Sequence, residues 1–282
     1  MEEKAQVTVV DVAALVVEVS ARRASRARGP FDTGPPIHET APATVPAAAD
    51  GCRVLVVAAH PDDVDFGAAG TVARFVEEGA GVSYCIVTDG DAGGYDRNVA
   101  RGEMASLRRE EQRAAALEVG VHDVVYLGYP DGRLTVTLDL RRDLSRVIRQ
   151  VRPDIVITQC PERNYERIPA SHPDHMAAGE AALCAIYPDA RNPFAHPELM
   201  EEGLEPHIVS ETWLMASASP TGAVDVTGSF GRKVAALKRH ESQVGDGSWL
   251  EGTLKEWMAR GAEVAGLVAG SLAEIFQVVH TG

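Results

Sequence analysis

Several features are scarce or missing in this sequence of 282 residues, and each absence argues against a class of protein. The chain has four cysteines and no CxxC pair, so we expect buried, reduced thiols and no disulfide framework. It has no apolar run long enough to span a bilayer, and its acidic start, MEEKAQ, does not resemble a signal peptide. We therefore expect a cytoplasmic protein without a membrane span.

Positive charge is also in short supply. The chain has 27 Lys and Arg against 41 Asp and Glu, which gives a formal net charge of −14. Such a surface repels phosphate backbones, so we expect no nucleic-acid partner and a small-molecule substrate instead. The glycines at the expected strand ends do not form a GxGxxG pattern, which argues against a dinucleotide site.

The first fifty residues differ in composition from the rest. Residues 7–19 could form a short helix or strand, but an Arg-rich stretch and five prolines between positions 30 and 46 disfavour regular structure after it. We predict a flexible N-terminal extension over residues 1–50 and one folded domain over residues 51–282.

From residue 53 onwards, apolar runs alternate with helical patterns. We predict strands at 53–59, 82–88, 123–128, 154–159 and 208–215, and helices at 67–78, 104–119, 138–151, from 173, at 230–241 and at 250–276. Nearly continuous apolar runs such as RVLVVAA are typical of parallel strands covered on both faces. This order predicts an α/β fold, a Rossmann-like three-layer sandwich with a mostly parallel sheet, whose ligands bind beyond the carboxyl ends of the strands.

The loop that follows the first of these strands is rich in ionisable groups. The strand at 53–59 runs directly into His60, Asp62, Asp63 and Asp65. Carboxylates that emerge together from a buried strand repel one another and need a positive partner. A divalent cation is the simplest partner, whereas Asp65 could equally orient His60 or face water.

A second segment, SHPDH, follows the strand at 154–159 and contains His172, Asp174 and His175. The two imidazoles are three positions apart at an expected helix start, so both can face one site. A catalytic zinc commonly takes two histidines and one carboxylate and keeps one position for water. The remaining carboxylate and histidine could then deprotonate that water and stabilise the tetrahedral intermediate. Which carboxylate binds the metal stays open at this point.

Together, AHPDDVDFGAAGTVA and SHPDH resemble the LmbE-like, or PIG-L, family of zinc-dependent deacetylases. The similarity extends over roughly residues 52–245 and includes TDGDAGG, Arg108 with Glu111, YPDGRL, RPDIVIT and LKRHESQ. The family includes enzymes that deacetylate glucosaminyl lipids, glucosaminyl-inositol and antibiotic sugars, and an amidase that acts on mycothiol conjugates. The resemblance implies the LmbE-like fold for residues 51–282.

The resemblance also implies a role for each residue of the two segments. One Zn²⁺ per chain would be held by His60, Asp63 and His175, and Asp62 would be the general base.

The resemblance also implies roles in proton transfer and in substrate binding. His172 would act as acid or oxyanion stabiliser, tuned by Asp174, and Arg108 and Asp131 match substrate-side positions. His240 resembles a family element near the pocket and is a third candidate for substrate binding, but it could equally be a histidine on a surface helix. Some relatives have a Tyr two positions before the first histidine of the second segment. This chain has Ala170 there, and whether the nearby Tyr165 substitutes stays open.

We therefore expect a zinc-dependent hydrolase that removes an N-acetyl or similar N-acyl group from an amino-sugar-containing small molecule. An amidase that cleaves a mycothiol-type thiol conjugate or another larger amide is the alternative within the same chemistry. A catalytically inert metal- or sugar-binding protein is an alternative of a different class, but binding alone would need neither Asp62 nor His172. The acyl group, the exact substrate and the oligomeric state do not follow from the sequence.

Overall fold

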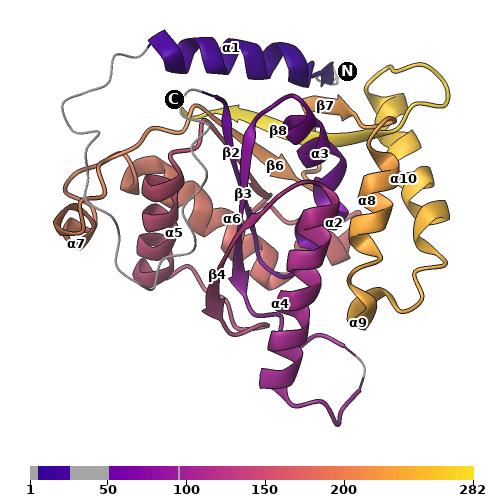
Figure 1. Cartoon of the computed structure of the whole chain (residues 1–282), viewed down its shortest axis with the longest axis horizontal. Helices are drawn as coiled ribbons and strands as arrows, with labels where there is room; N and C mark the ends of the chain where they lie inside the picture. Colours follow the sequence, from indigo (N-terminus) through magenta and orange to yellow (C-terminus); the bar gives the residue numbers. More distant parts are fainter. Residues whose placement is uncertain (1–5, 26–50, 95) are drawn as a thin grey trace.

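The computed structural model describes residues 6–25, 51–94 and 96–282. The strands in these residues form a single eight-stranded sheet. The strand order is β1-β7-β8-β6-β5-β2-β3-β4 (Figure 1). The strands are β1 (Thr8–Val9), β2 (Arg53–Ala58), β3 (Gly81–Thr88), β4 (Asp123–Tyr129), β5 (Ile155–Gln159), β6 (Glu211–Met215), β7 (Gly222–Asp225) and β8 (Ala273–His280). Only the pairs of β8 with β6 and with β7 are antiparallel. The mostly parallel α/β fold predicted above is confirmed.

Helices cover both faces of the sheet, as Figure 1 shows. One face packs against α1 (Val12–Ser25), α2 (Asp63–Gly67), α3 (Ala69–Glu77), α4 (Arg101–Glu118), α8 (Phe230–Leu237), α9 (Glu241–Val244) and α10 (Leu250–Val264). The other face packs against α5 (Leu138–Val151) and α6 (Pro173–Cys184), while α7 (Pro197–Glu201) lies in a later excursion. In the part of the chain that the structure describes, no helix combines the length and hydropathy needed to cross a bilayer.

The central strand β2 shows why its sequence is a continuous apolar run. Val54 and Val56 belong to the core on one face of the sheet, whereas Leu55 and Val57 belong to the core on the other face. All four side chains are fully buried. Successive side chains of a strand point to opposite faces, so a strand covered on both sides needs an apolar residue at every position.

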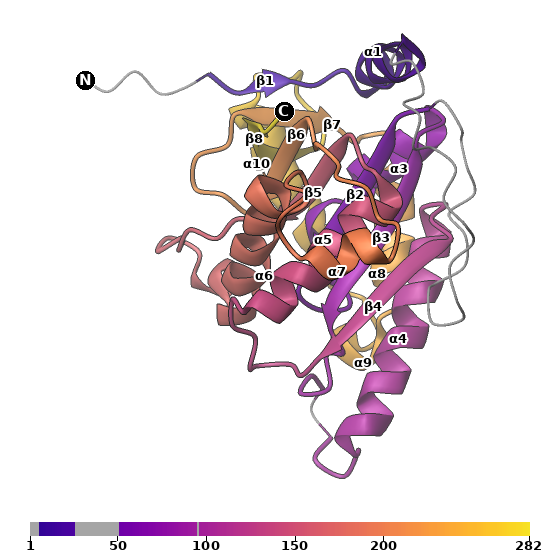
Figure 2. The ribbon, with the colours of Figure 1, turned by 90° about the vertical axis from the view of Figure 1, so that its left-hand side faces the viewer.

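Part of the N-terminal segment belongs to the fold, which corrects the prediction of a flexible extension for those residues. β1 pairs in parallel with β7. α1 lies at one end of the sheet, and α9 lies at the other end (Figure 2). Val12 and Val16, four residues apart on one face of α1, are buried in the core. Ser20 accepts a hydrogen bond from the Cys52 N–H (3.0 Å). Residues 1–5 and 26–50 lie outside the described part of the chain.

The prediction of one helix over residues 250–276 is wrong at its carboxyl end. α10 ends at Val264, and Ala273–His280 forms β8 between β6 and β7. Gly266 and Gly270 have positive φ angles of 70° and 92°, a conformation that stops a helix and that glycine adopts at little cost. The strand that follows, AEIFQVVH, pairs with both β6 and β7, and a helix could not form these strand pairs.

The four cysteines are free thiols. Cys52, Cys85 and Cys160 are buried as expected, whereas Cys184 is partly exposed. Burial raises the pKa of the Cys52 thiol to about 12 and that of Cys85 further still, so both stay protonated and unreactive near neutral pH.

A buried ion pair joins α8 to β8 beneath the first loop. Lys233 Nζ lies 2.6 Å from Glu274 Oε1 and also donates to the backbone carbonyls of Asp65 and Phe66. The two charged side chains are almost completely buried. We expect Lys233→Met to lower the free energy of unfolding by about 3–5 kcal/mol, because it leaves the Glu274 carboxylate buried without its cation.

Urea denaturation measures this effect, with Lys255→Met as the matched control. Lys255 forms a pair of similar length with Glu251 (2.7 Å), but both side chains are more than half exposed. The control is expected to leave the midpoint unchanged. Equal midpoints for Lys233→Met and the wild type would contradict the account of a structural buried pair.

Candidate active site

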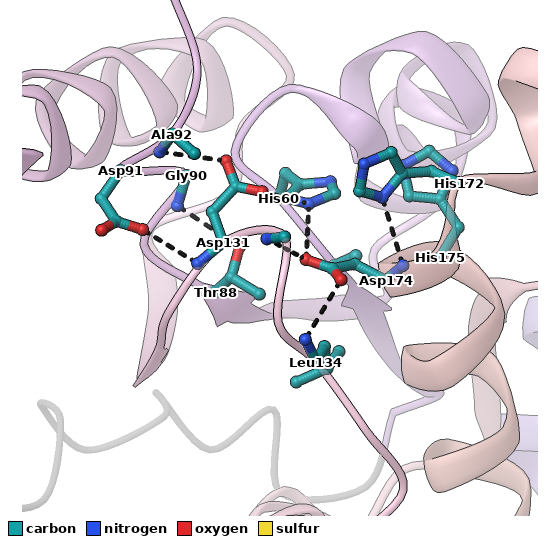
Figure 3. Close-up of polar contacts among 12 residues, drawn as sticks. His60, Thr88, Gly90, Asp91, Ala92, Asp131, Leu134, His172, Asp174 and His175 are labelled. Carbon is teal, nitrogen blue, oxygen red and sulfur yellow. Dashed lines mark hydrogen bonds and ion pairs between the residues drawn. The ribbon is translucent and has the colours of Figure 1, made fainter.

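Ionisable side chains gather beyond the carboxyl ends of β2, β4 and β5, and Figure 3 shows most of them. They come from the loop after β2, the loop after β4 and the first turn of α6. The members of this site cluster are His60, Asp62, Asp63, Asp131, His172, Asp174 and His175. The two segments chosen from the sequence, 60–65 and 171–175, do meet at one edge of the sheet.

Asp63 lies between two imidazoles. His60 Nδ1 is 3.2 Å from Asp63 Oδ2, and His175 Nε2 is 3.0 Å from Asp63 Oδ1. The Gln159 side chain at the end of β5 donates to Asp63 Oδ2 (2.8 Å) and accepts from the Ala59 N–H (2.9 Å). Burial alone would raise the pKa of Asp63, but the attraction of His175 and hydrogen bonds from both histidines lower it well below its usual range.

The other nitrogen of His60 faces two more carboxylates (Figure 3). His60 Nε2 lies 3.1 Å from Asp131 Oδ1 and 3.2 Å from Asp174 Oδ2. Burial would lower the pKa of His60, but its hydrogen bonds to Asp131, Asp174 and Asp63 raise it to about 12. One buried imidazole thus faces three carboxylates, and the excess negative charge must be balanced by a proton or a cation.

The site cluster fits a divalent metal ion by the chemistry of its donors. Among the described residues, ligand atoms come close enough to share an ion in two groups, His60 with His172 and His175, and His60 with Asp131 and Asp174. Asp63 touches both His60 and His175, although these three residues are not one of the two groups. Imidazole nitrogens with one or two carboxylates suit zinc and neighbouring transition metals. Which combination binds the ion is taken up below.

His172 caps the N-terminus of α6 and points its imidazole into the site cluster. Its Nδ1 accepts a hydrogen bond from the Asp174 backbone N–H (3.2 Å), so in the neutral ring the proton lies on Nε2. Burial, together with the nearby His60 and His175, lowers the pKa of His172. His172 is therefore a neutral imidazole at neutral pH with one N–H available to donate.

The Asp174 carboxylate does not contact the His172 ring, but its negative charge acts to raise the pKa of His172, against the larger effects that lower it. It accepts from the backbone N–H groups of Gly132 (2.7 Å) and Leu134 (3.1 Å) and contacts His60 Nε2. The reason is local: His172 already caps α6 through the Asp174 backbone, which leaves the carboxylate free to reach the loop after β4.

Asp62, a member of the site cluster, has an unusual backbone conformation, with a φ of 93°. Its Oδ2 lies 3.2 Å from Arg108 Nη2, and both side chains are largely buried. Arg108 also donates to the Gly90 carbonyl (3.0 Å), and a Cβ at Gly93 would lie 2.4 Å from Arg108 Nη1. The glycines of TDGDAGG therefore leave room for the guanidinium.

The pKa of Asp62 is raised to about 6. Burial is the main cause, because it penalises the charged carboxylate, and Asp63 adds repulsion. Arg108 opposes the shift by stabilising the charge. A carboxylate with a raised pKa beside a possible metal site is a suitable acceptor for a proton.

Two of the residues expected on the substrate side lie in or beside the site cluster. Asp131 touches His60 directly and accepts from the Ala92 N–H (3.3 Å), and Arg108 lies between Asp62 and Asp131. The contact between Asp131 and His60 was not foreseen. Gln159 was missed as well, although a polar residue at the end of a buried strand is the same signal that singled out His60.

His240 is not placed to touch a substrate, which contradicts that expectation. It is fully buried, and its Nε2 lies 2.8 Å from Asp65 Oδ2. Asp65 is fully buried too, so it neither orients His60 nor faces water. A buried imidazole and a buried carboxylate each needed a partner, and the fold supplies each with the other.

The position before the second segment lacks a tyrosine, and its neighbourhood offers no clear replacement. The Ala170 carbonyl lies 3.3 Å from His175 Nδ1 and so fixes the orientation of that ring. Tyr165 is 82% exposed, so its side chain is not packed against the site cluster.

Comparison with known proteins agrees with this geometry. Residues 55–186 match the model of the PIG-L family, described as GlcNAc-PI de-N-acetylase. A diacetylchitobiose deacetylase of Thermococcus kodakarensis is 32% identical over 197 residues, which cover 70% of this chain and 72% of that protein. A 1D-myo-inositol 2-acetamido-2-deoxy-alpha-D-glucopyranoside deacetylase of Rhodococcus erythropolis is 30% identical over 243 residues, covering 68% and 81%.

A solved structure is similar over most of both chains. The N,N'-diacetylchitobiose deacetylase from Pyrococcus horikoshii, in complex with an inhibitor, has a TM-score of 0.75 and 30% identity. The match covers 81% of this chain and 84% of that one. With the two segments at one edge of a shared fold, and with curated relatives covered over more than two thirds of their length, the chain belongs to the PIG-L family of de-N-acetylases.

Proposed function

We propose that this protein is a zinc-dependent deacetylase that removes an N-acetyl group from an amino-sugar-containing small molecule. The observation that carries the proposal is the placement of Asp62 beside a carboxylate that two imidazoles share. The relatives support it, because those compared above are deacetylases of compounds that contain N-acetylglucosamine.

The residues that would hold the metal are His60, Asp63 and His175. Two imidazoles and one carboxylate make up a frequent protein ligand set for catalytic zinc. Bound there, zinc would polarise the amide carbonyl and lower the pKa of its water to about 7. Asp131 and Asp174 contact the opposite nitrogen of His60 and would hold that ring in place.

Asp62 would carry the proton, and His172 would stabilise the oxyanion. Asp62 accepts a proton from the water whose oxygen attacks the carbonyl carbon. The His172 Nε2–H donates a hydrogen bond to the carbonyl oxygen as negative charge develops there. When the C–N bond breaks, the proton held by Asp62 passes to the departing nitrogen, which leaves acetate and a free amine.

The pH dependence of the reaction follows from the raised pKa of Asp62, which is about 6. A general base must be deprotonated, so kcat is expected to be constant above this pKa and to fall about tenfold per pH unit below it. A pH–rate profile at saturating substrate measures this. An acid limb at the usual aspartate pKa of about 4 would contradict the role of burial.

Acetate release from a panel of N-acetylated sugars tests the proposed function. The panel contains diacetylchitobiose, N-acetylglucosaminyl-inositol and N-acetylglucosaminyl-malate, with an N-acylated thiol conjugate as the competing larger amide. Chelator-sensitive acetate release from any of the sugars supports the proposal. Release of a larger acid from the conjugate alone identifies an amidase, and metal binding without turnover of any amide identifies a binding protein.

A further inference from the structure

A line of buried polar side chains connects the start of α9 to the backbone of Asp62. His240 Nε2 and Gln112 Nε2 both lie 2.8 Å from Asp65 Oδ2, and the Asp62 N–H donates to Gln112 Oε1 (2.8 Å). His240, Asp65 and Gln112 are fully buried and come from three different parts of the chain. Nothing in the proposed reaction uses any of these three side chains.

The direction of every hydrogen bond in this line is determined by its members. The Asp65 carboxylate oxygen accepts, so the Gln112 amide must turn its NH₂ group towards Asp65. Its carbonyl oxygen is thereby turned towards the Asp62 N–H. The His240 proton lies on Nε2 for the same reason. Asp65 thus determines which way the Gln112 amide faces, and His240 helps to hold Asp65.

Asp62 needs such a support. Its φ of 93° and ψ of −26° lie in the left-handed region, which residues with a side chain rarely adopt unless their surroundings hold them there. The preceding residue is Pro61, which has no N–H of its own to anchor the turn. The helix that follows, α2, has only five residues, too few to determine the conformation of the chain before it.

Helix α4 contacts Asp62 at two points. Arg108 and Gln112 are four residues apart and so share one face of α4. Arg108 contacts the Asp62 carboxylate, and Gln112 accepts from the Asp62 backbone. The far end of α2 is held separately, because Lys233 donates to the carbonyls of Asp65 and Phe66.

We propose that Gln112 is a positioning residue for Asp62, and that Asp65 and His240 act through it by fixing the direction of its amide. Gln112 holds the backbone turn that aims the Asp62 carboxylate at the site cluster. The inference rests on the function of Asp62 proposed above, and none of the three side chains contacts substrate.

Gln112→Met tests the inference, because it keeps the length of the side chain and removes the acceptor. We expect kcat to fall about 10–100-fold, as is usual when a supporting residue is removed, with KM within about threefold of wild type. Zinc content per chain is expected to stay at the wild-type value, because the metal ligands keep their own partners. Hydrogen exchange of the Asp62 amide is expected to become faster. This measurement reports loss of the hydrogen bond to Gln112 independently of enzymatic activity.

Two variants serve as comparisons. Gln112→Glu is buried beside Asp65, which favours the protonated acid, and that form donates to Asp65 and accepts from Asp62 as the amide does. It is expected to keep kcat within about fivefold of wild type and slow exchange at Asp62, since both bonds are retained. Glu111→Gln is the matched control, because Glu111 lies next to Gln112 but binds Ser242 instead of the Asp62 turn. It is expected to leave kcat unchanged.

The possible outcomes separate this inference from the proposed function. A wild-type protein that hydrolyses none of the amides refutes the proposed function itself. An active wild type with Gln112→Met at undiminished kcat, or with unchanged exchange at Asp62, overturns the positioning role alone. Equal losses of kcat in Gln112→Met and Gln112→Glu overturn it too, as does a loss that only follows a lower zinc content. If Gln112→Met does not fold, the Gln112→Glu result decides.

Discussion

Asp62→Asn is expected to lower kcat by about 10²–10⁴-fold at saturating zinc, because the variant removes the only proton acceptor proposed for the attacking water. The amide of asparagine has the shape of the carboxylate but cannot take up a proton. The Asp62 N–H would still donate to Gln112, so the turn itself is expected to survive. Steady-state kinetics of acetate release, with the zinc content of each sample measured alongside, reports the effect.

Asp123→Asn is the control for this substitution. Asp123 begins β4 and is buried, but its contact with Ser83 lies at the opposite ends of the strands. It is expected to leave kcat unchanged. If Asp62→Asn retained the wild-type kcat with a full complement of zinc, Asp62 would not be the base, and the proton would have to pass to another group.

Asp63→Ala is expected to lose both the bound zinc and the activity. Asp63 is the carboxylate that His60 and His175 share, and polarisation by a metal supplies several kcal/mol of catalysis, so kcat is expected to fall by about 10³-fold or more. Elemental analysis after dialysis measures zinc per chain, and added zinc at high concentration is expected to restore little of the activity.

Asp131→Asn distinguishes the possible metal sites. Asp131 and Asp174 form the other carboxylate set around His60. If His60, Asp63 and His175 hold the ion, Asp131→Asn keeps stoichiometric zinc, whereas Asp63→Ala does not. The opposite pattern, with zinc lost from Asp131→Asn and kept by Asp63→Ala, would move the metal to the second set and reject the proposed ligand assignment.

The parallel core of the fold could be predicted because its strands carry a strong local signal. β2 and β5 each contain a nearly continuous apolar run that leads into polar residues, so their positions and the site at their carboxyl ends followed directly. β8 could not be found in this way, because the apolar residues of AEIFQVVH directly extend the pattern of a good helix, and only Gly266 and Gly270 interrupt it.

The partners of the site residues were harder to predict than the residues themselves. The motifs HPDD and HPDH indicate ionisable groups at the ends of strands. Contacts such as Asp131 with His60, or Gln112 with Asp62, instead join positions that are 71 and 50 residues apart in the sequence. They depend on how the loop after β4 and helix α4 pack against the sheet. His240 is a further example. Its motif, LKRHESQ, matches the family, but the sequence does not show that its partner is the buried Asp65.

The most direct test of the account is to measure zinc and acetate release in the same preparations. Purified protein would be assayed with diacetylchitobiose as isolated, after removal of metal by a chelator, and after zinc is restored. We expect about one zinc per chain, loss of acetate release when the metal is removed, and its return when zinc is restored. Acetate release that persists at full rate in metal-free protein would contradict a metal-dependent deacetylase.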